Sequence, residues 1–504
     1  MSADLATTVH ALIERAAARA PDAVYAVGLV DGQVLRYEAL ARSCRRVGAL
    51  LQAHGLRAGD TLSLVMPNGL QTLRILLGAM HAGITVNPVN LLSQPEQMRY
   101  VLGHSDCKLV CVAPEWAPRV RALLAGLDRP VAVLVAEPDG DALPGETDAP
   151  HALPAPPPEA IALLMYTSGT TGAPKGVMLT QANLAANAHA ISVEHGLTPA
   201  DRVLAVLPLY HINAFAVTML APLAHGGSLA MPAKFSAARF WEQAAGCSWL
   251  NVVPTMISYL LEGATPPRAQ TASIRFCRSA SAALPPEHHR AFEAKFGIGI
   301  IETMGLTETV APSFSNPLDA ALRKLGSVGR ASGCEARVID AALRPVPDGT
   351  TGELAIRGPN VMRGYYKNDA ATRASFTPDG WLRTGDLGHR DADGFFFVTG
   401  RIKELIIKGG ENIAPREIDE ALLAHPAVLD AAAVGIPDPH YGQEILACVV
   451  LREGVTCSED ELRAFCVEQL GRYKTPKRLR FVTELPRGPS GKVQRLKLLD
   501  LPET

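Results

Sequence analysis

Residues 166–176 carry groups suited to binding a polyphosphate. They read Tyr-Thr-Ser-Gly-Thr-Thr-Gly-Ala-Pro-Lys-Gly, with four Ser or Thr hydroxyls, three glycines and one lysine. Glycines permit turns with positive φ and close approach of backbone N–H groups to an anion, and the lysine adds a positive charge. The spacing excludes a P-loop, because Pro174 stands where the second glycine would be and Gly176 follows Lys175. A polar surface turn is the alternative interpretation.

Four further segments supply charged groups that chemistry on a nucleotide requires. A carboxylate after a glycine turn, as at Glu308, suits Mg²⁺, which takes oxygen ligands and bridges phosphates. Asp386 suits ribose hydroxyls, and Lys492 lies on a loop stiffened by proline and glycine. Alone, each would be a turn carboxylate, a helix cap, a surface ion pair or an exposed lysine, whereas their joint occurrence favours a nucleotide site. The segments are Glu-Thr-Met-Gly-Leu-Thr-Glu (302–308), Trp-Leu-Arg-Thr-Gly-Asp (381–386), Gly-Arg-Ile-Lys-Glu-Leu (400–405) and Pro-Arg-Gly-Pro-Ser-Gly-Lys (486–492).

The elements that must position these groups alternate between helical and strand patterns. Apolar periodicity predicts helices over 37–54 and 70–82, and short apolar runs predict strands over 61–66, 108–112 and 161–165. A helical run starts near Gln181. This alternation is typical of parallel sheets covered by crossover helices, so the fold class is α/β.

After residue 352 the sequence pattern changes from alternating helices and strands to mainly strands. Segments 352–357 and 395–398 have a β pattern and are separated by Pro-Asp-Gly and Asp-Ala-Asp-Gly turns. After 400–403 a second α/β unit is expected, with a helix over 415–424 and strands over 428–434 and 445–451. About 100 residues suffice for a small domain with its own core.

Composition describes a well-packed protein without electrostatic affinity for nucleic acid or membranes. The chain has 504 residues, 48% hydrophobic residues and a net charge of −2. Its nine cysteines form no metal-binding or disulfide pattern, which favours reduced thiols and a cytoplasmic location. No apolar run reaches the length of a membrane helix. The sequence leaves a homodimer open.

A basic run near the C-terminus is the exception to this neutrality. Between Arg472 and Lys497 there are nine Lys or Arg residues and a single acid, Glu484. A solvated basic face is one explanation, and contact with the phosphates of a small molecule is the other. Nucleic-acid binding is disfavoured because Tyr473 and Phe481 are the only potential stacking residues in this run.

Together these motifs closely resemble the acyl-adenylate-forming superfamily of acyl-CoA synthetases, peptide-synthetase adenylation domains and luciferases, from about Val9 to Leu499. The resemblance implies a large N-terminal domain (1–400) with layered α/β sheets and a β-rich subdomain. It also implies a small, mobile α+β C-terminal domain (401–504) that carries Lys492, with Lys403 as the hinge.

The same resemblance implies an ATP site and a role for each of its residues. Segment 168–175 would bind the β- and γ-phosphates, Thr307 a phosphate, and Glu308 Mg²⁺; Ser281 and Ala282 would border the adenine. Met304 departs from the family, which commonly has a stacking tyrosine there. The implied catalytic residues are Lys492, Thr307, Glu308 and His211. The implied ATP-binding residues are Thr167, Ser168, Gly169, Thr170, Thr171, Gly172, Lys175, Ser281, Ala282, Glu302, Thr303, Met304, Thr307, Asp386, Arg401 and Lys492.

The activity implied is AMP-forming ligation of a carboxylic acid to coenzyme A. ATP and the acid would give an acyl-adenylate and pyrophosphate, and coenzyme A would then give the thioester and AMP. A carboxylate is a poor nucleophile beside a triphosphate because both are anionic, so Mg²⁺ and the Lys492 ammonium would stabilise the first step. Thiolate attack needs another surface, which rotation about Lys403 would bring in. Loading of a separate carrier protein and a non-catalytic, nucleotide-binding regulator are the alternatives.

Three residues of the expected acid pocket, His211, Tyr259 and Arg278, bear on the choice of acid. His211 lies where the family has an acyl-pocket gate. Malonate ligases of the family carry an arginine where this chain has Tyr259, which disfavours malonate. Arg278 suits a second anionic group through bidentate hydrogen bonds. Short segments such as Lys-Phe-Ser-Ala (234–237) and Ser-Asn-Pro-Leu (315–318) resemble those of the oxalate-CoA ligase branch. We therefore expect a short polar acid, such as oxalate or a sulfonated C2 acid, with a medium-chain, long-chain or aromatic acid as the alternative.

Overall fold

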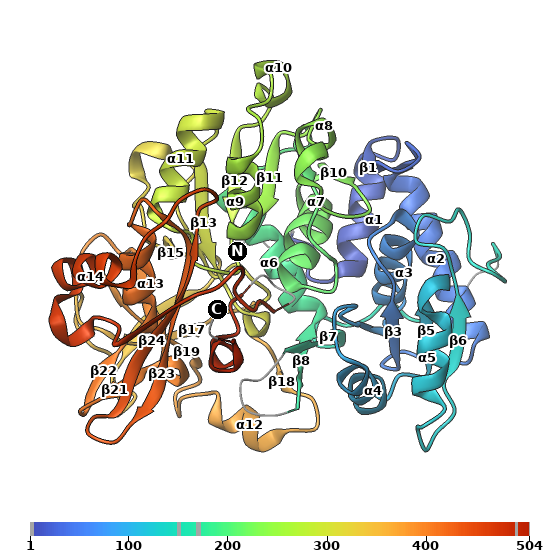
Figure 1. Cartoon of the computed structure of the whole chain (residues 1–504). Coiled ribbons are helices and arrows are strands. Elements are labelled where there is room, and N and C mark those ends of the chain that lie inside the picture. The colour runs from blue at the N-terminus through green and yellow to red at the C-terminus, as the bar shows by residue number, and fades with distance from the viewer. Residues whose placement is uncertain (1–4, 149–152, 168–172, 489–491, 503–504) are drawn as a thin grey trace.

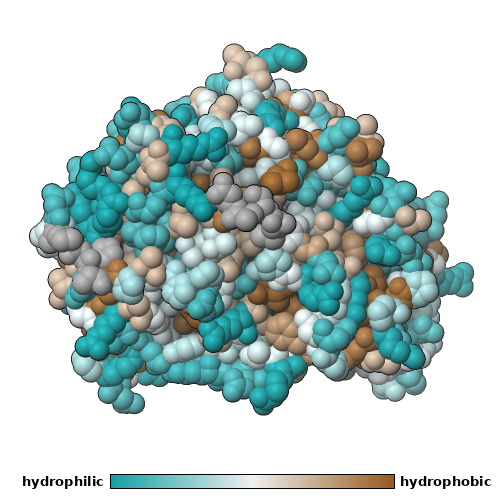
Figure 2. Space-filling model, turned by 180° about the vertical axis from the view of Figure 1, so that it is seen from behind, coloured by the Kyte–Doolittle hydropathy of each residue, from teal (hydrophilic) through white to brown (hydrophobic). Residues whose placement is uncertain are grey.

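The chain folds into four β-sheets with helices packed around them (Figure 1). The computed structural model describes residues 5–148, 153–167, 173–488 and 492–502. The mixed α/β architecture predicted from the sequence is confirmed. Among the described residues no helix is long and apolar enough to cross a membrane, and the nine cysteines are free thiols. Seen from the opposite side, most of the surface is hydrophilic, with hydrophobic residues scattered between (Figure 2).

A seven-stranded sheet carries the segment around Lys175. Its inner parallel strands, 61–65, 85–88 and 109–112, are buried on both faces, which matches their near-continuous apolar runs. Residues 175–180, for which the sequence predicted no element, form a strand that pairs antiparallel with the strand before it, and Val177 and Leu179 are buried. The order is β18 (Gly364–Tyr365), β8 (Lys175–Thr180), β7 (Ile161–Thr167), β4 (Thr85–Pro88), β3 (Thr61–Val65), β5 (Leu109–Val112) and β6 (Ala132–Val135).

A nine-stranded sheet lies beside it and presents the carboxyl ends of parallel strands toward the expected nucleotide and acid sites. Parallel pairing joins β11 to β12 and β12 to β13, with Asn251 opposite Arg278 and Ser279 opposite Glu302. The order is β15 (Arg330–Ala331), β14 (Phe314–Ser315), β13 (Ile300–Met304), β12 (Phe276–Ser279), β11 (Trp249–Val252), β9 (Arg202–Leu204), β10 (Ser228–Met231), β1 (Val24–Gly28) and β2 (Val34–Arg36).

A four-stranded antiparallel sheet forms the β-rich part of the large domain. Its strands are β16 (Glu335–Ile339), β17 (Gly352–Arg357), β19 (Leu382–Arg390) and β20 (Phe396–Arg401). The register places Asp386 opposite Arg401. Two candidate residues fifteen positions apart in the sequence therefore become neighbours across one hairpin.

Residues after 405 build a separate five-stranded sheet with hydrophobic clusters of its own. Helices α13 and α14 contribute to one cluster, and the 3-10 turn at 495–500 contributes Leu498 to the other. In Figure 1 this unit, orange to red, lies on the left, apart from the seven-stranded sheet on the right. Its strands are β22 (Glu411–Ile413), β21 (Ile406–Lys408), β24 (Gly442–Leu451) and β23 (Val428–Asp438), with β25 (Arg478–Phe481) paired to β24.

The helices begin and end where local chemistry predicts. In α1, Thr8 accepts a hydrogen bond from the Ala11 amide, and the buried residues Val9, Leu12 and Ala16 share one face. The α-helices are α1 (Val9–Arg19), α2 (Tyr37–Ala53), α3 (Leu70–His81), α4 (Pro95–His104), α5 (Ala117–Leu124), α6 (Gln181–Glu194), α7 (Ala221–His225), α8 (Phe240–Gln243), α9 (Pro254–Glu262), α10 (Arg268–Thr271), α11 (Pro286–Phe296), α12 (Asp369–Ala374), α13 (Pro415–Leu423) and α14 (Glu459–Lys474). Short 3-10 turns span Pro114–Trp116, Ala237–Arg239, Thr307–Thr309, Ala320–Leu322, Ile402–Glu404 and Arg495–Asp500, and a π-helix spans Ala214–Leu220.

Two buried histidines are expected to make the large domain acid-sensitive. Burial lowers the pKa of His195 to about 3 and that of His225 to about 4. Both values lie below the usual 6.5, so the unfolded chain binds protons first and stability falls as the pH drops below 6.5. Between pH 7 and 5.5 the free energy of unfolding should fall by about 2.5 kcal/mol. Urea unfolding at both pH values measures this.

The Glu14 carboxylate contributes little in that interval. The Glu14 carboxyl has a pKa of about 2, chiefly because His81 hydrogen bonds to it, and its stabilisation is lost below pH 4.5. Variant His225→Gln should retain about half of the pH dependence. A free energy of unfolding that is unchanged between pH 7 and 5.5 would contradict the assignment.

Candidate active site

The buried Asp386 carboxylate pairs with the half-buried Arg401 side chain and has one unused acceptor. Arg401 Nε donates to Asp386 Oδ1 at 2.7 Å, and Asp386 is 4% exposed. The other carboxylate oxygen, Oδ2, has no hydrogen-bond partner in the described part of the chain. A buried acceptor without a donor is costly, so this oxygen is suited to a hydroxyl of a bound molecule. The geometry agrees with the expected ribose contact.

Glu308 and Lys175 both contact the side chain of Tyr365. Glu308 lies in the 3-10 turn directly after β13, and Tyr365 Oη donates to its Oε1 at 2.8 Å. The Lys175 ammonium lies 4.8 Å from the centre of the Tyr365 ring. Burial and the Glu308 carboxylate raise the pKa of Tyr365, which keeps the phenol protonated as a donor. The expected phosphate-binding lysine and the expected Mg²⁺ ligand thus lie in one cluster.

Sequence reasoning missed Tyr365. The residue stands in β18, which pairs with β8, so its register partner Val177 is two residues from Lys175. It is 57 positions from Glu308, and no short motif marks it. A buried tyrosine between a carboxylate and a lysine is visible only once the sheet is formed.

The Lys492 side chain lies within electrostatic range of the Asp386–Arg401 pair, although it belongs to the C-terminal unit. The surrounding protein and the Arg401 charge lower the pKa of Lys492, while Asp386 and Glu404 act in the opposite direction. The side chain keeps contact with solvent. A cation with a lowered pKa beside an unused ribose acceptor is suited to stabilise charge on a nucleotide phosphate.

Arg495 anchors the segment that carries Lys492. Its guanidinium donates to Glu404 (Nε to Oε2, 3.2 Å), to the Ala433 carbonyl (Nη1, 2.8 Å) and to both oxygens of buried Asp419. Glu404 follows the expected hinge, Lys403. The Arg495 side chain thus ties the hinge, α13 and β23 to the turn that follows Lys492.

Replacing this anchor is expected to displace Lys492 and so to slow the adenylation that the sequence motifs imply. Variant Arg495→Met leaves the Asp419 carboxylate buried without its cation, which costs about 3–5 kcal/mol. The double variant Arg495→Met/Asp419→Leu removes both charges and should recover most of the lost stability but not the adenylation rate. Thermal unfolding and pyrophosphate release measure the two effects. Equal recovery of both would show that Arg495 acts on stability alone.

Arg278 is a fully buried arginine without a carboxylate partner among the described residues. It stands in β12 and is 0% exposed. Its Nη1 donates to Asn213 Oδ1 at 2.6 Å and to Asn251 Oδ1 at 2.7 Å, and Asn213 Nδ2 donates to Ser281 Oγ at 3.2 Å. Nε and Nη2 have no partner in the described chain. Burial lowers the pKa of Arg278 to about 9.

This arrangement favours an anion as the missing partner. Burying a guanidinium with two unsatisfied nitrogens is costly unless a ligand supplies acceptors. Asn213 directly precedes the π-helix Ala214–Leu220, a structure common at functional sites. Through Ser281, the network reaches the segment expected to border the adenine.

The remaining candidates occupy varied positions. Ser281 adopts a positive φ of 75°; Glu302 is buried and pairs with His289 at 3.1 Å, a contact that serves the fold. Thr303 Oγ1 donates to the Ser279 carbonyl. Tyr259 is 56% exposed on α9. Five further candidates are half-buried: Thr167, His211, Ala282, Met304 and Thr307. The expected hinge residue, Lys403, is exposed. The remaining candidates lie outside the described residues: Ser168, Gly169, Thr170, Thr171 and Gly172.

The fold and these contacts define a nucleotide-dependent enzyme of two units, and comparison with known proteins identifies its class. Residues 13–366 match the AMP-binding enzyme family and residues 417–492 match the AMP-binding enzyme C-terminal domain. The chain belongs to the AMP-binding enzyme family. The expected class, AMP-forming acid–thiol ligases, is confirmed by the relatives that follow.

Two relatives match almost the whole chain. It is 61% identical to sulfoacetate–CoA ligase of Cupriavidus necator over 501 residues, covering 98% of this chain and 97% of the relative. It is 35% identical to oxalate–CoA ligase of Arabidopsis thaliana over 508 residues, covering 97% of each. Among solved structures, ATP-bound MatB from Rhodopseudomonas palustris matches with a TM-score of 0.92 and apo MatB with 0.82; both are 31% identical, and 98% of each chain is covered.

Proposed function

We propose that this enzyme joins coenzyme A to a short acid that carries a second anionic group, with sulfoacetate as the preferred acid. The observation that carries the proposal is the buried Arg278 guanidinium, whose Nε and Nη2 have no protein partner. A sulfonate keeps its charge at all physiological pH values and offers three acceptor oxygens to the N–H groups of the guanidinium. The 61% identity to sulfoacetate–CoA ligase supports this choice.

In the first half-reaction the acid attacks the α-phosphate of ATP. One acid oxygen forms a bond to phosphorus as the bond to the β,γ-pyrophosphate breaks, which gives the acyl-adenylate. The Asp386 oxygen Oδ2 accepts from a ribose hydroxyl, Lys175 contacts the outer phosphates, and Lys492 stabilises charge on the α-phosphate. Glu308 would hold Mg²⁺, which supplies charge neutralisation on the phosphates.

In the second half-reaction the coenzyme A thiolate displaces AMP. For this step Lys492 must move out of the active site. We propose that the C-terminal domain, which begins after residue 400, rotates about Lys403 to move it. The higher TM-score with ATP-bound than with apo MatB supports an adenylating orientation for the structure described here. The basic run 472–497 offers positive charge for the 3′-phosphate of coenzyme A, and the free cysteine thiols agree with a cytoplasmic location.

Oxalate is the second candidate, because it also carries a second anionic group and the 35% identical relative is an oxalate–CoA ligase. Malonate is disfavoured by Tyr259, which is uncharged and largely exposed. Long-chain acids are disfavoured by Arg278, because an aliphatic chain beside a buried guanidinium supplies no acceptor.

The test is pyrophosphate release with ATP and Mg²⁺ across a panel of acids, with and without coenzyme A. The panel holds sulfoacetate, oxalate, malonate, acetate, benzoate and octanoate. We expect sulfoacetate to give the highest kcat/KM, with stoichiometric AMP and thioester. Pyrophosphate without thioester would instead indicate a carrier protein as acceptor, and preference for octanoate would overturn the assignment of Arg278.

A further inference from the structure

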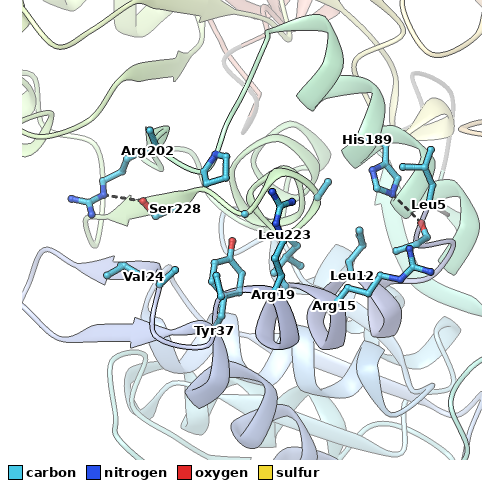
Figure 3. Close-up of a pocket in the computed structure, with 18 of the residues that line it drawn as sticks. Leu5, Leu12, Arg15, Arg19, Val24, Tyr37, His189, Arg202, Leu223 and Ser228 are labelled. Atoms are coloured by element: carbon cyan, nitrogen blue, oxygen red, sulfur yellow. Dashed lines mark hydrogen bonds between the residues drawn. The ribbon is translucent and has the colours of Figure 1, made fainter. Parts of the chain in front are cut away.

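A second pocket lies between the N-terminal helix and elements that follow β8. It has a volume of about 650 Å³, within the range of small-molecule sites. Its walls come from α1, α6, α7 and the adjoining ends of β9 and β10 (Figure 3). None of its lining residues belongs to the candidate active site.

The floor of this pocket is apolar. Leu12 and Ala16 of α1 and Leu223 and Ala224 of α7 line it. The buried Tyr37 hydroxyl is already used, because it donates to the backbone carbonyls of Pro222 and Gly227. Tyr37 is fully buried, so it supports the bottom of the pocket but has neither its ring nor its hydroxyl free for a ligand. An apolar body of a ligand would be buried here.

Positive charges surround this floor. Among the described residues, the charged side chains of the lining are Arg15, Arg19 and Arg202. Figure 3 shows Arg19 rising from α1 into the pocket, and in the described part of the chain no hydrogen bond or ion pair involves its side chain. Arg202 Nε donates to Ser228 Oγ at 3.0 Å and has no carboxylate partner among the described residues. Like charges in a cleft raise the local concentration of anions.

We propose that this pocket is a binding site for a small organic anion with an apolar body, such as an aromatic or aliphatic sulfonate or carboxylate. The apolar part lies against the partly exposed Ala20, Ala23 and Ala224, and the acidic group reaches the Arg19 guanidinium. The Arg202 guanidinium contacts a second acceptor. The site is separate from the one that binds ATP, so a ligand here and ATP are bound simultaneously.

The test uses the fluorescence of 1-anilinonaphthalene-8-sulfonate, an aromatic sulfonate, with the full-length protein held at saturating ATP, Mg²⁺ and sulfoacetate. We expect one saturable site per chain. Variant Arg19→Ala should weaken its affinity by about tenfold, and Arg19→Glu should weaken it further. The uncharged analogue N-phenyl-1-naphthylamine should bind both variants within about twofold of the unmodified protein, since it has no group for the arginine.

Arg19 ends an exposed turn of α1, so neither variant should unfold the protein, and thermal unfolding verifies this. Arg121→Ala on α5 is the matched control, because Arg121 is also exposed on a helix but lies outside the pocket; it should leave the affinity unchanged. Absence of saturable binding at saturating ATP would overturn the proposal. So would an Arg19→Glu variant with unchanged affinity for the sulfonate.

Discussion

Replacement of Lys492 by glutamine is expected to slow acyl-adenylate formation by about 100-fold or more and to leave thioester formation nearly unchanged. The amide keeps the length and polarity of the side chain near Asp386 and Arg401 but removes the charge that would stabilise the α-phosphate. Displacement of AMP by the thiolate needs no cation at that position. Pyrophosphate release measures the first half-reaction, and thioester formation from supplied acyl-adenylate measures the second.

The matched control for this variant is Lys497→Gln. Lys497 is an exposed lysine on the same segment, five residues further on, and should leave both half-reactions within about twofold of the unmodified enzyme. Equal slowing of both half-reactions by Lys492→Gln would contradict the proposed division of labour. It would mean that Lys492 stays in the site throughout the reaction.

Replacement of Arg278 by methionine is expected to lower kcat/KM for sulfoacetate by about 100-fold or more, because the sulfonate loses charged hydrogen bonds in a buried site. For acetate, which has no second anionic group, the loss should stay below about tenfold. Stability should change little. The variant removes a guanidinium with two unsatisfied nitrogens. It leaves the Asn251 oxygen without its donor, whereas the Asn213 oxygen still accepts from Asn251 Nδ2 at 3.3 Å. Steady-state kinetics with both acids and urea unfolding test these outcomes.

Arg275→Met provides the comparison for this variant. Arg275 directly precedes β12 and pairs with Asp201 at 2.6 Å, away from the Arg278 network. Its loss should reduce stability without changing the preference for sulfoacetate over acetate. An Arg278→Met enzyme that loses activity equally on both acids would show that Arg278 supports the fold of the site and does not select the acid.

The sequence predicts elements well where periodicity is strong. The helix expected over 37–54 is α2, and the strand expected over 61–66 is β3, each within one residue of its predicted end. Buried apolar runs and amphipathic faces are local properties, so a short window of sequence contains them. Strand β8 was missed because the Gly- and Thr-rich residues before it obscure its alternation.

The chemistry of Arg278 shows what local patterns leave out. Its type and family context made it a candidate, but its partners Asn213 and Asn251 lie 65 and 27 positions away. Asn251 becomes its neighbour only through the parallel register of β11 and β12. That the guanidinium is buried and lacks a carboxylate is likewise a property of packing. Such long-range juxtapositions decide which acid fits, and no motif encodes them.

Asp386 and Arg401, the proposed ribose-binding pair, lie close to the proposed pivot, since Arg401 is two residues from Lys403. A rotating body moves each of its points in proportion to the distance from its axis. Turning the C-terminal unit would therefore carry Lys492 through a wide arc while Arg401 hardly shifts. The acyl-adenylate would therefore stay bound through its ribose while Lys492 moves away and the surface for coenzyme A moves in. Its dissociation between the two half-reactions would be reduced.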